Sequence, residues 1–203
     1  MGGDEAIMEN KPVKRPAVFL DRDGTINEQM GYINHISRFV LLPGVSRAIS
    51  RLNHCGYLTI VLSNQSGVAR GYFPIELVYR VNDHMQSMLR RDNATIDAVF
   101  FCPHYPNGKV PEYSRSCDCR KPGIGLVQKA EKHFDIDMQN SYMVGDRYTD
   151  IEMANRCGLP AVLVKTGYGL GDLEYVIPKK GLKPRYIASD LQDAVEWIIR
   201  STD

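Results

Sequence analysis

Short apolar runs alternate with segments of helical spacing along this chain, and this alternation limits the possible folds more than any other feature. Strands that alternate with helices need right-handed crossovers, and they form a parallel sheet with helices on both faces. We therefore predict an α/β fold, a Rossmann-like three-layer sandwich with a central parallel sheet. The runs expected to be strands are residues 17–20, 58–62, 98–101, 142–144 and 161–164.

The chain has 203 residues, which is long enough for one domain with a substantial core. We expect this single domain over residues 16–203, after a flexible polar leader over residues 1–15. Apolar residues recur with helical spacing between the strands. The expected helices cover residues 44–55, 74–91, 124–134, 149–157 and 190–200.

The composition is that of an ordinary globular protein, with 43% apolar and 24% charged residues. The net charge of +1 gives no electrostatic reason to expect nucleic acid or an anionic membrane as a partner. No stretch approaches the roughly 18 uninterrupted apolar residues of a membrane span, and the first residues lack the apolar core of a signal peptide. We expect a cytoplasmic protein and, because no apolar surface stripe is obvious, a monomer.

Two carboxylates follow the first predicted strand directly. Ligands of parallel sheets bind beyond the carboxyl ends of the strands, and Asp21 and Asp23 lie there on a turn that contains Gly24. One carboxylate can attack phosphorus while the other transfers a proton. Asp-x-Asp-Gly also occurs in surface turns and calcium loops, so this pair alone leaves both interpretations open.

Three further segments favour a phosphate site. Ser63 ends the second strand, Arg120 and Lys121 place two cations side by side, and Asp146 follows the fourth strand. Each has an ordinary alternative: a turn former, a solvated cation and a helix cap. Their common location near strand ends argues against these alternatives. A phosphate dianion repels a carboxylate, so such a site needs Mg²⁺ and fixed cations.

Residues 21–25 (Asp-Arg-Asp-Gly-Thr), the Ser63 strand end, Lys121 and the Gly-Asp146 segment resemble the four motifs of the haloacid dehalogenase-like phosphatases. By that resemblance Asp21 is the nucleophile and Asp23 the general acid/base. Asp21, the backbone of Asp23, and Asp146 would hold Mg²⁺. Ser63 and Lys121 would steady the phosphoryl group.

A second cluster lies in the long irregular stretch after the third strand. Cys102 and His104, then Cys117 and Cys119, offer three thiolates and one imidazole, the closed tetrahedral set that structural zinc prefers. The alternative is free thiols scattered in a loop. An odd total of five cysteines without a secretion signal is typical of a reducing compartment, where clustered cysteines bind metal more often than they pair.

We therefore predict a zinc-bound loop over residues 102–119. The ion would do no chemistry, because the set leaves no open coordination position. It would fold a loop that has too few apolar residues to order itself, and it would fix the direction of the next residues, Arg120 and Lys121.

Over residues 16–200 the combined motifs resemble a narrower family, the D-glycero-D-manno-heptose 1,7-bisphosphate 7-phosphatases. The resemblance implies release of the 7-phosphate of a small sugar bisphosphate in nucleotide-activated heptose biosynthesis, for example towards lipopolysaccharide. Related histidinol-phosphate phosphatases share the metal loop and are the alternative within enzymes. A sugar-phosphate-binding module without turnover is the alternative outside enzymes.

The resemblance also carries over a substrate site. No large insertion resembling a cap domain interrupts the motifs, so short loops would shape the pocket. Asp150 would orient its neighbours, and Arg147 stands where the family commonly has lysine. Gly123-Ile124-Gly125 departs from the His-Pro-Gly turn that the resemblance implies before the next helix. The substrate-binding residues implied are Gln29, Met30, Gly31, Tyr32, Ser63, Asn64, Gln65, Ser66, Arg120, Lys121 and Arg147.

Overall fold

The computed structural model describes residues 13–202. The first twelve residues of the predicted leader lie outside this part, and its last residue, Arg15, already begins strand β1. Among residues 13–202, no helix is both long enough and apolar enough to cross a membrane.

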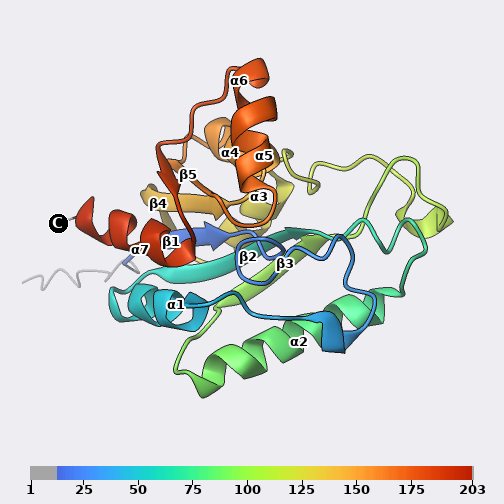
Figure 1. Ribbon diagram of the computed structural model, residues 1–203, viewed down its shortest axis with the longest axis horizontal. Coiled ribbons are helices and arrows are strands. Elements are labelled where there is room, and N and C mark those ends of the chain that lie inside the picture. The colour runs from blue at the N-terminus through green and yellow to red at the C-terminus, as the bar shows by residue number, and fades with distance from the viewer. Residues whose placement is uncertain (1–12, 203) are drawn as a thin grey trace, which may run out of the picture.

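Within the described residues, six parallel strands form one sheet in the order β3-β2-β1-β4-β5-β6 (Figure 1). The predicted α/β sandwich with a central parallel sheet is therefore confirmed. The strands are β1 (Arg15–Leu20), β2 (Leu58–Asn64), β3 (Ala98–Cys102), β4 (Ile136–Gly145), β5 (Ala161–Val164) and β6 (Tyr186–Ala188).

Helices connect these strands, and each of the five predicted helices is present with bounds that differ by one residue at most. Between β1 and β2 the described chain forms a loop, one short 3-10 turn and α1, which is too little for a large cap domain. The helices are α1 (Val45–His54), α2 (Ile75–Arg91), α3 (Gly125–His133), α4 (Tyr148–Arg156), α5 (Gly169–Gly171), α6 (Ile177–Lys180) and α7 (Leu191–Arg200), with 3-10 turns at Ile36–Arg38 and Pro111–Tyr113 and a π-helical turn at Asp172–Val176.

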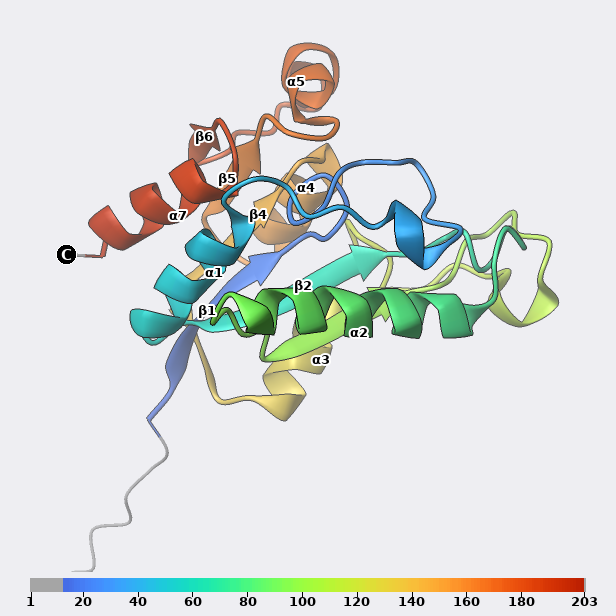
Figure 2. The ribbon, with the colours of Figure 1, turned by 60° about the horizontal axis from the view of Figure 1, so that its bottom comes forward.

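Alternate residues of each strand face opposite layers, as the period of two in a strand requires. Val18 and Leu20 of β1 pack into one core with α1, α2 and α7, and Ala17 and Phe19 pack into a second core with α3 and α4. Figure 1 shows α1 and α2 on one side of the strands and α3 and α4 on the other. Figure 2 brings α2 forward, where it crosses in front of the sheet. Burial on both faces explains why the central strands read as continuous apolar runs.

Three features differ from the sequence prediction. β4 begins at Ile136 rather than at residue 142, because the mostly polar residues 137–141 hide its first half from an apolar pattern. β6 is an edge strand of three residues, too short to give a periodic signal. The helical segment Gly169–Lys180 was also not predicted, and it covers the chain between β5 and β6.

Candidate active site

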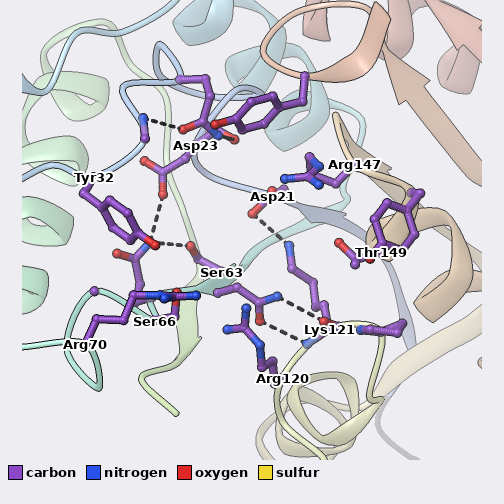
Figure 3. Close-up of a pocket in the computed structure, with 18 of the residues that line it drawn as sticks. Asp21, Asp23, Tyr32, Ser63, Ser66, Arg70, Arg120, Lys121, Arg147 and Thr149 are labelled. Carbon is purple, nitrogen blue, oxygen red and sulfur yellow. Dashed lines mark hydrogen bonds and ion pairs between the residues drawn. The ribbon is translucent and has the colours of Figure 1, made fainter. Parts of the chain in front are cut away.

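The carboxyl ends of β1, β2 and β4 meet at a pocket of about 550 Å³ (Figure 3). Asp21 follows β1 directly, Ser63 lies at the end of β2, and both line this pocket. Lys121 reaches it from the loop before α3, and Asp146 follows β4 just behind it. The strand ends therefore bring together residues that are up to 125 positions apart, since Asp21 and Asp146 both belong to this group.

Lys121 is the cation at the centre of the site. Its Nζ lies 2.8 Å from Asp21 Oδ1 and 2.7 Å from Asp150 Oδ1, and it donates to the carbonyl oxygen of Leu62 at 2.7 Å. Only 3% of Lys121 is exposed. Burial alone lowers the pKa of Lys121, but the Asp150 and Asp21 carboxylates outweigh it and leave the pKa above its ordinary value. The ammonium is therefore charged when it faces Asp21.

Asp146 completes a cluster of three acids. Ligand oxygens of Asp21, Asp146 and Asp150 all lie within 4.8 Å of one another. Burial, and then the charges of Asp21 and Asp150, raise the pKa of Asp146 to about 9. Burial also raises the pKa of Asp150 to about 6 despite Lys121. Three carboxylates around one lysine are a costly arrangement in a buried site unless a further cation joins them.

The donor set around Asp146 fits a divalent cation. The amide of Tyr168 donates to Asp146 Oδ2 at 2.8 Å, whereas the buried Oδ1 has no hydrogen-bond partner within residues 13–202. A buried carboxylate oxygen without a hydrogen-bond partner is free to bind a cation. Together with the neighbouring carboxylates it offers the oxygen ligands that Mg²⁺ prefers. Gly24, at φ +91°, keeps this space open, because a Cβ there would overlap the Asp146 carboxylate.

Asp23 lies beside this cluster with its carboxylate directed elsewhere. Arg22 Nη2 contacts its two oxygens at 3.1 and 2.9 Å, and Gln65 Nε2 donates to Oδ2 at 2.8 Å. Arg22 is almost fully buried, and its Nη1 donates to Asn82 Oδ1 of α2 at 2.9 Å. Asp23 was predicted as a metal ligand through its backbone, and its side chain is not part of the acid cluster. Helix α2 therefore helps to orient Asp23 through Arg22.

The residues at the end of β2 position two different residues of the site, Asp23 and Lys121. Gln65 Nε2 donates to Ser63 Oγ at 2.8 Å, which connects Ser63 to Asp23. Asn64 instead forms two hydrogen bonds with the backbone of Lys121. Its Oδ1 accepts from the Lys121 N–H at 3.0 Å, and its Nδ2 donates to the Lys121 carbonyl oxygen at 3.1 Å. Asn64 therefore fixes the position of Lys121. Ser66, the last residue of the segment 63–66, lines the pocket.

Asp150 lies at the base of the site, between Lys121 and the start of α4. Its Oδ2 accepts from the backbone N–H of Arg147 at 3.0 Å while Oδ1 faces Lys121. The side chain of Arg147 lines the pocket, and its Nε lies 2.9 Å from Asp172 Oδ2. Asp172 belongs to the helical segment absent from the prediction, and no motif marked it as part of the site.

Most of the predicted substrate-binding residues line the pocket. Gln29, Gly31 and Tyr32 do so, whereas Met30 is absent from the lining and packs against the core beside α1 and α2. Arg120 and Lys121 lie on the wall formed by the loop after β3 (Figure 3). The lining residues absent from the prediction include Arg70, Tyr148, Thr149 and Tyr168.

The four residues of the predicted zinc loop converge. Cys102 Sγ lies 3.3 Å from the sulfurs of Cys117 and Cys119, which are 2.9 Å apart. His104 Nδ1 lies 3.1 to 3.7 Å from the three sulfurs. Burial, together with Arg115 and Lys129, lowers the pKa of His104 and so favours the neutral imidazole that metal binding requires. The arrangement is compatible with a closed tetrahedral metal site.

The fold and the site define a phosphoric monoester hydrolase of the haloacid dehalogenase-like class, and a family model described as HAD-hydrolase-like matches residues 118–194. A D-glycero-D-manno-heptose-1,7-bisphosphate 7-phosphatase from Thermosynechococcus vestitus is 43% identical over 188 residues, covering 91% of this chain and 95% of that protein. A D-glycero-beta-D-manno-heptose-1,7-bisphosphate 7-phosphatase from Escherichia coli K12 is 37% identical over 187 residues, covering 92% and 89%.

Solved structures agree. The D,D-heptose 1,7-bisphosphate phosphatase from B. bronchiseptica, crystallised with magnesium and phosphate, superposes with a TM-score of 0.81 at 30% identity, covering 92% of this chain and 99% of that one. The chain therefore belongs to the family of D-glycero-D-manno-heptose-1,7-bisphosphate 7-phosphatases.

Proposed function

We propose that this chain is a Mg²⁺-dependent phosphatase that removes the 7-phosphate of D-glycero-D-manno-heptose 1,7-bisphosphate in nucleotide-activated heptose biosynthesis. The observation that carries the proposal is the buried Asp21–Lys121 pair at 2.8 Å on the wall of the pocket. It supplies a carboxylate nucleophile beside a permanent cation that can neutralise a phosphoryl oxygen. The substrate assignment is supported by the names of the relatives that cover nine-tenths of the chain.

Asp21 is the proposed nucleophile. Its Oδ1 receives hydrogen bonds from the Arg22 amide at 2.7 Å and from Lys121, so the carboxylate is held in one orientation. In the first step this carboxylate attacks phosphorus, and the phosphorus–oxygen bond to the sugar breaks. Asp23 gives its proton to the departing sugar oxygen, and an aspartyl-phosphate remains. Arg22 and Gln65 steady Asp23 while it changes charge.

The second step restores the enzyme. Asp23 takes a proton from water, the resulting hydroxide attacks the phosphorus of the aspartyl-phosphate, and inorganic phosphate leaves with the electron pair returned to Asp21. Ser63 and Lys121 steady the phosphoryl oxygens in both steps. Asp21, Asp146 and the backbone of Asp23 would hold Mg²⁺, as the orphaned Asp146 oxygen suggests. Bound there, the ion supplies the positive charge that offsets the dianionic phosphate.

Zinc is the proposed occupant of the second metal site. Cys102, His104, Cys117 and Cys119 would hold it, and all four positions of a tetrahedral ion would be filled. The role proposed for the ion is structural. It orders the loop that ends at Arg120, which we propose as a substrate-recognition residue.

The partner proposed is a small sugar bisphosphate, bound by a monomer in the cytoplasm. All five cysteines are free, which supports a reducing compartment. Histidinol phosphate is the alternative substrate. Its ammonium group is a poor match for a pocket wall with Arg70 and Arg120, which form no ion pair within residues 13–202, so the bisphosphate is the better electrostatic partner.

Release of phosphate from heptose 1,7-bisphosphate and from histidinol phosphate tests the proposal. We expect the bisphosphate to have the larger kcat/KM, and a large preference for histidinol phosphate would overturn the substrate assignment. In a second arm, Asp21→Asn should lower kcat by at least about 10³-fold, because the amide is not a nucleophile. Calorimetric binding of the bisphosphate should persist in this variant. Retained turnover would exclude Asp21 as nucleophile, and a wild-type protein that binds without turnover would be a sugar-phosphate-binding module.

A further inference from the structure

Asp172 is a buried carboxylate to which neither the motifs nor the proposed mechanism gives a role. It begins the π-helical turn Asp172–Val176, and only 6% of it is exposed. Of the four buried aspartates within residues 13–202, it is the one outside the acid cluster. A buried charge is costly unless it is paired and hydrogen-bonded. The partners of Asp172 therefore indicate what this carboxylate does.

One oxygen of Asp172 accepts two hydrogen bonds. Oδ2 accepts from Arg147 Nε at 2.9 Å and from the backbone N–H of Tyr148 at 2.7 Å. Tyr148 is the first residue of α4, so no carbonyl of that helix is available to its N–H. Asp172 therefore fixes two groups at once, the guanidinium of Arg147 and the start of α4. Both groups directly follow Asp146 in the chain.

The guanidinium of Arg147 is held on one edge and open on the other. Arg147 lines the pocket across from Arg70 (Figure 3). Its Cζ lies 4.6 Å from the centre of the Tyr168 ring and 5.7 Å from that of Tyr148. Asp172 occupies its Nε, whereas Nη1 and Nη2 have no hydrogen-bond partner within residues 13–202. These two nitrogens carry most of the N–H donors of a guanidinium, and they remain available to an anion in the pocket.

The helical segment that carries Asp172 is anchored on two sides. The backbone N–H of Asp172 donates to the carbonyl oxygen of Tyr168 at 2.9 Å, and the N–H of Tyr168 donates to Asp146 Oδ2 at 2.8 Å. Beyond Asp172, Leu173 and Ile177 pack into the core that α3 and α4 share with the sheet. The Asp172 carboxylate is therefore held in place by the protein itself, without a ligand.

We propose that Asp172 is a positioning residue of the active site, which holds Arg147 by Nε so that Nη1 and Nη2 stay directed to the phosphate-bearing substrate. This inference rests on the proposed function for the anion that Arg147 meets. One oxygen on Nε leaves the outer edge of the guanidinium unpaired, so the pair retains donors for phosphate oxygens. Fixing these donors in advance lowers the entropy cost of binding. Asp172 then acts on substrate affinity and not on the chemical step at Asp21.

Steady-state kinetics with heptose 1,7-bisphosphate, on the protein loaded with both metals, test this role. Asp172→Ala should raise KM by about 3- to 10-fold and leave kcat within about 2-fold, because a hydrogen bond that orients Arg147 is lost. Asp172→Asn keeps an acceptor oxygen in a side chain of the same shape and should recover most of this loss. Glu174→Ala, at an exposed acid of the same π-helical turn, should leave KM unchanged. An equal rise of KM in Asp172→Ala and Asp172→Asn would overturn positioning by this hydrogen bond.

A double-mutant cycle separates positioning from a merely structural role at the start of α4. In an Arg147→Ala background, Asp172→Ala should change KM by less than about 2-fold, because the side chain that it positions is absent. If Asp172 only stabilised α4 through the Tyr148 N–H, its removal would raise KM by the same factor in both backgrounds, and the inference would be overturned.

The Nε–H signals of arginines in NMR spectra test the contact in the ligand-free protein. The Arg147 signal, assigned by its loss in Arg147→Ala, should exchange with water more slowly than that of Arg80, an exposed arginine of α2. Asp172→Ala should remove this protection. A wild-type Arg147 signal that exchanges as fast as that of Arg80 would overturn the inference without any substitution of Asp172.

The two proposals can fail separately. If the wild type protects the Arg147 Nε–H but does not hydrolyse heptose 1,7-bisphosphate, the proposed function fails and the positioning contact stands. If the wild type hydrolyses this substrate and Asp172→Ala has the same KM, the positioning role fails and the proposed function stands.

Discussion

The two predicted metal sites of this molecule are built in opposite ways. The acid cluster lies at the ends of buried strands, and its central residue, Lys121, is 3% exposed. The Cys–His loop has only one 3-10 turn, and none of residues 103–120 is buried. In both ribbon views this loop projects beyond the sheet (Figures 1 and 2). Packing against the sheet orders the first site, whereas the second has only partly buried or exposed side chains over residues 103–120.

The comparison separates two uses of a metal. In the acid cluster the backbone, Asn64 and Lys121 already fix the side chains, so an ion there would serve charge and chemistry rather than folding. In the loop only Cys102 of the four ligands is buried, so an ion there would supply folding free energy that side-chain burial does not. Loss of metal should therefore act mainly on activity at the first site and on local structure as well at the second.

The largest effect on activity and stability should follow removal of the positive charge from the acid cluster. Lys121→Met removes the cation between Asp21 and Asp150 and leaves two buried carboxylates facing each other. We expect kcat/KM to fall by about 10²- to 10³-fold, because a fixed charge on the transferred phosphate is lost. The free energy of unfolding should fall by about 3–5 kcal/mol, as for a broken buried ion pair. Phosphate release and urea unfolding measure the two effects.

A second substitution distinguishes charge from packing. In Lys121→Met combined with Asp150→Asn, the repulsion inside the cluster is relieved, so stability should return towards the wild type while activity stays low. If the double variant were as unstable as Lys121→Met, the lysine would contribute through packing instead. Recovery of activity in the double variant would contradict a direct role of Lys121.

A smaller effect should follow a break in the Cys–His loop. Cys117→Ala removes one ligand from the cluster and should abolish stoichiometric zinc, measured by elemental analysis. The loop should then become sensitive to limited proteolysis while the sheet keeps its circular dichroism signal. We expect kcat/KM to fall by about 10- to 100-fold, largely in KM, because Arg120 donates to the His104 carbonyl of this loop and Arg70 stacks on its Tyr105 ring.

Cys55→Ala is the matched control, because Cys55 is an exposed free cysteine outside the cluster. It should change neither zinc content nor kinetics. A Cys117→Ala protein that lacks zinc yet keeps its proteolytic resistance and wild-type kinetics would show that the loop folds without the ion, and the contrast between the two sites would be lost.

The sequence predicted the parts of the site that follow strand ends. Asp21, Ser63 and Asp146 could be found because a buried strand is readable as an apolar run, and its end fixes where the next side chain lies. The central strands and the five main helices could be found for the same reason. β6 and the first half of β4 could not, since a short edge strand and a polar stretch give no such pattern.

Contacts that depend on tertiary packing left no signal in the sequence. Arg70, Asp172 and Asn82 belong to no motif, and each reaches the site from a separate turn or helix. Spacing along the chain reports which residues share one element, not which elements pack side by side. These supporting residues are therefore visible only once the fold is known.

The smallest effect should come from one of these supporting contacts. Asn82→Leu removes the α2 partner of the buried Arg22, which orients Asp23. The unsatisfied donor should lower the free energy of unfolding by about 1–3 kcal/mol. A less fixed Asp23 should lower kcat by less than about 10-fold while KM stays near the wild-type value, because proton transfer is affected and substrate contacts are not.

Ser87→Leu makes a similar substitution at an exposed position of the same helix, so it controls for general effects on α2. If kcat falls only in Asn82→Leu, the order around Asp23 extends from the strand ends into the helical layer that covers them. A fall in stability with kcat unchanged would confine the role of Asn82 to folding. Asp23 would then be positioned by the strand-end loops alone, and in this respect the active site would resemble the Cys–His loop, whose order depends mainly on local contacts.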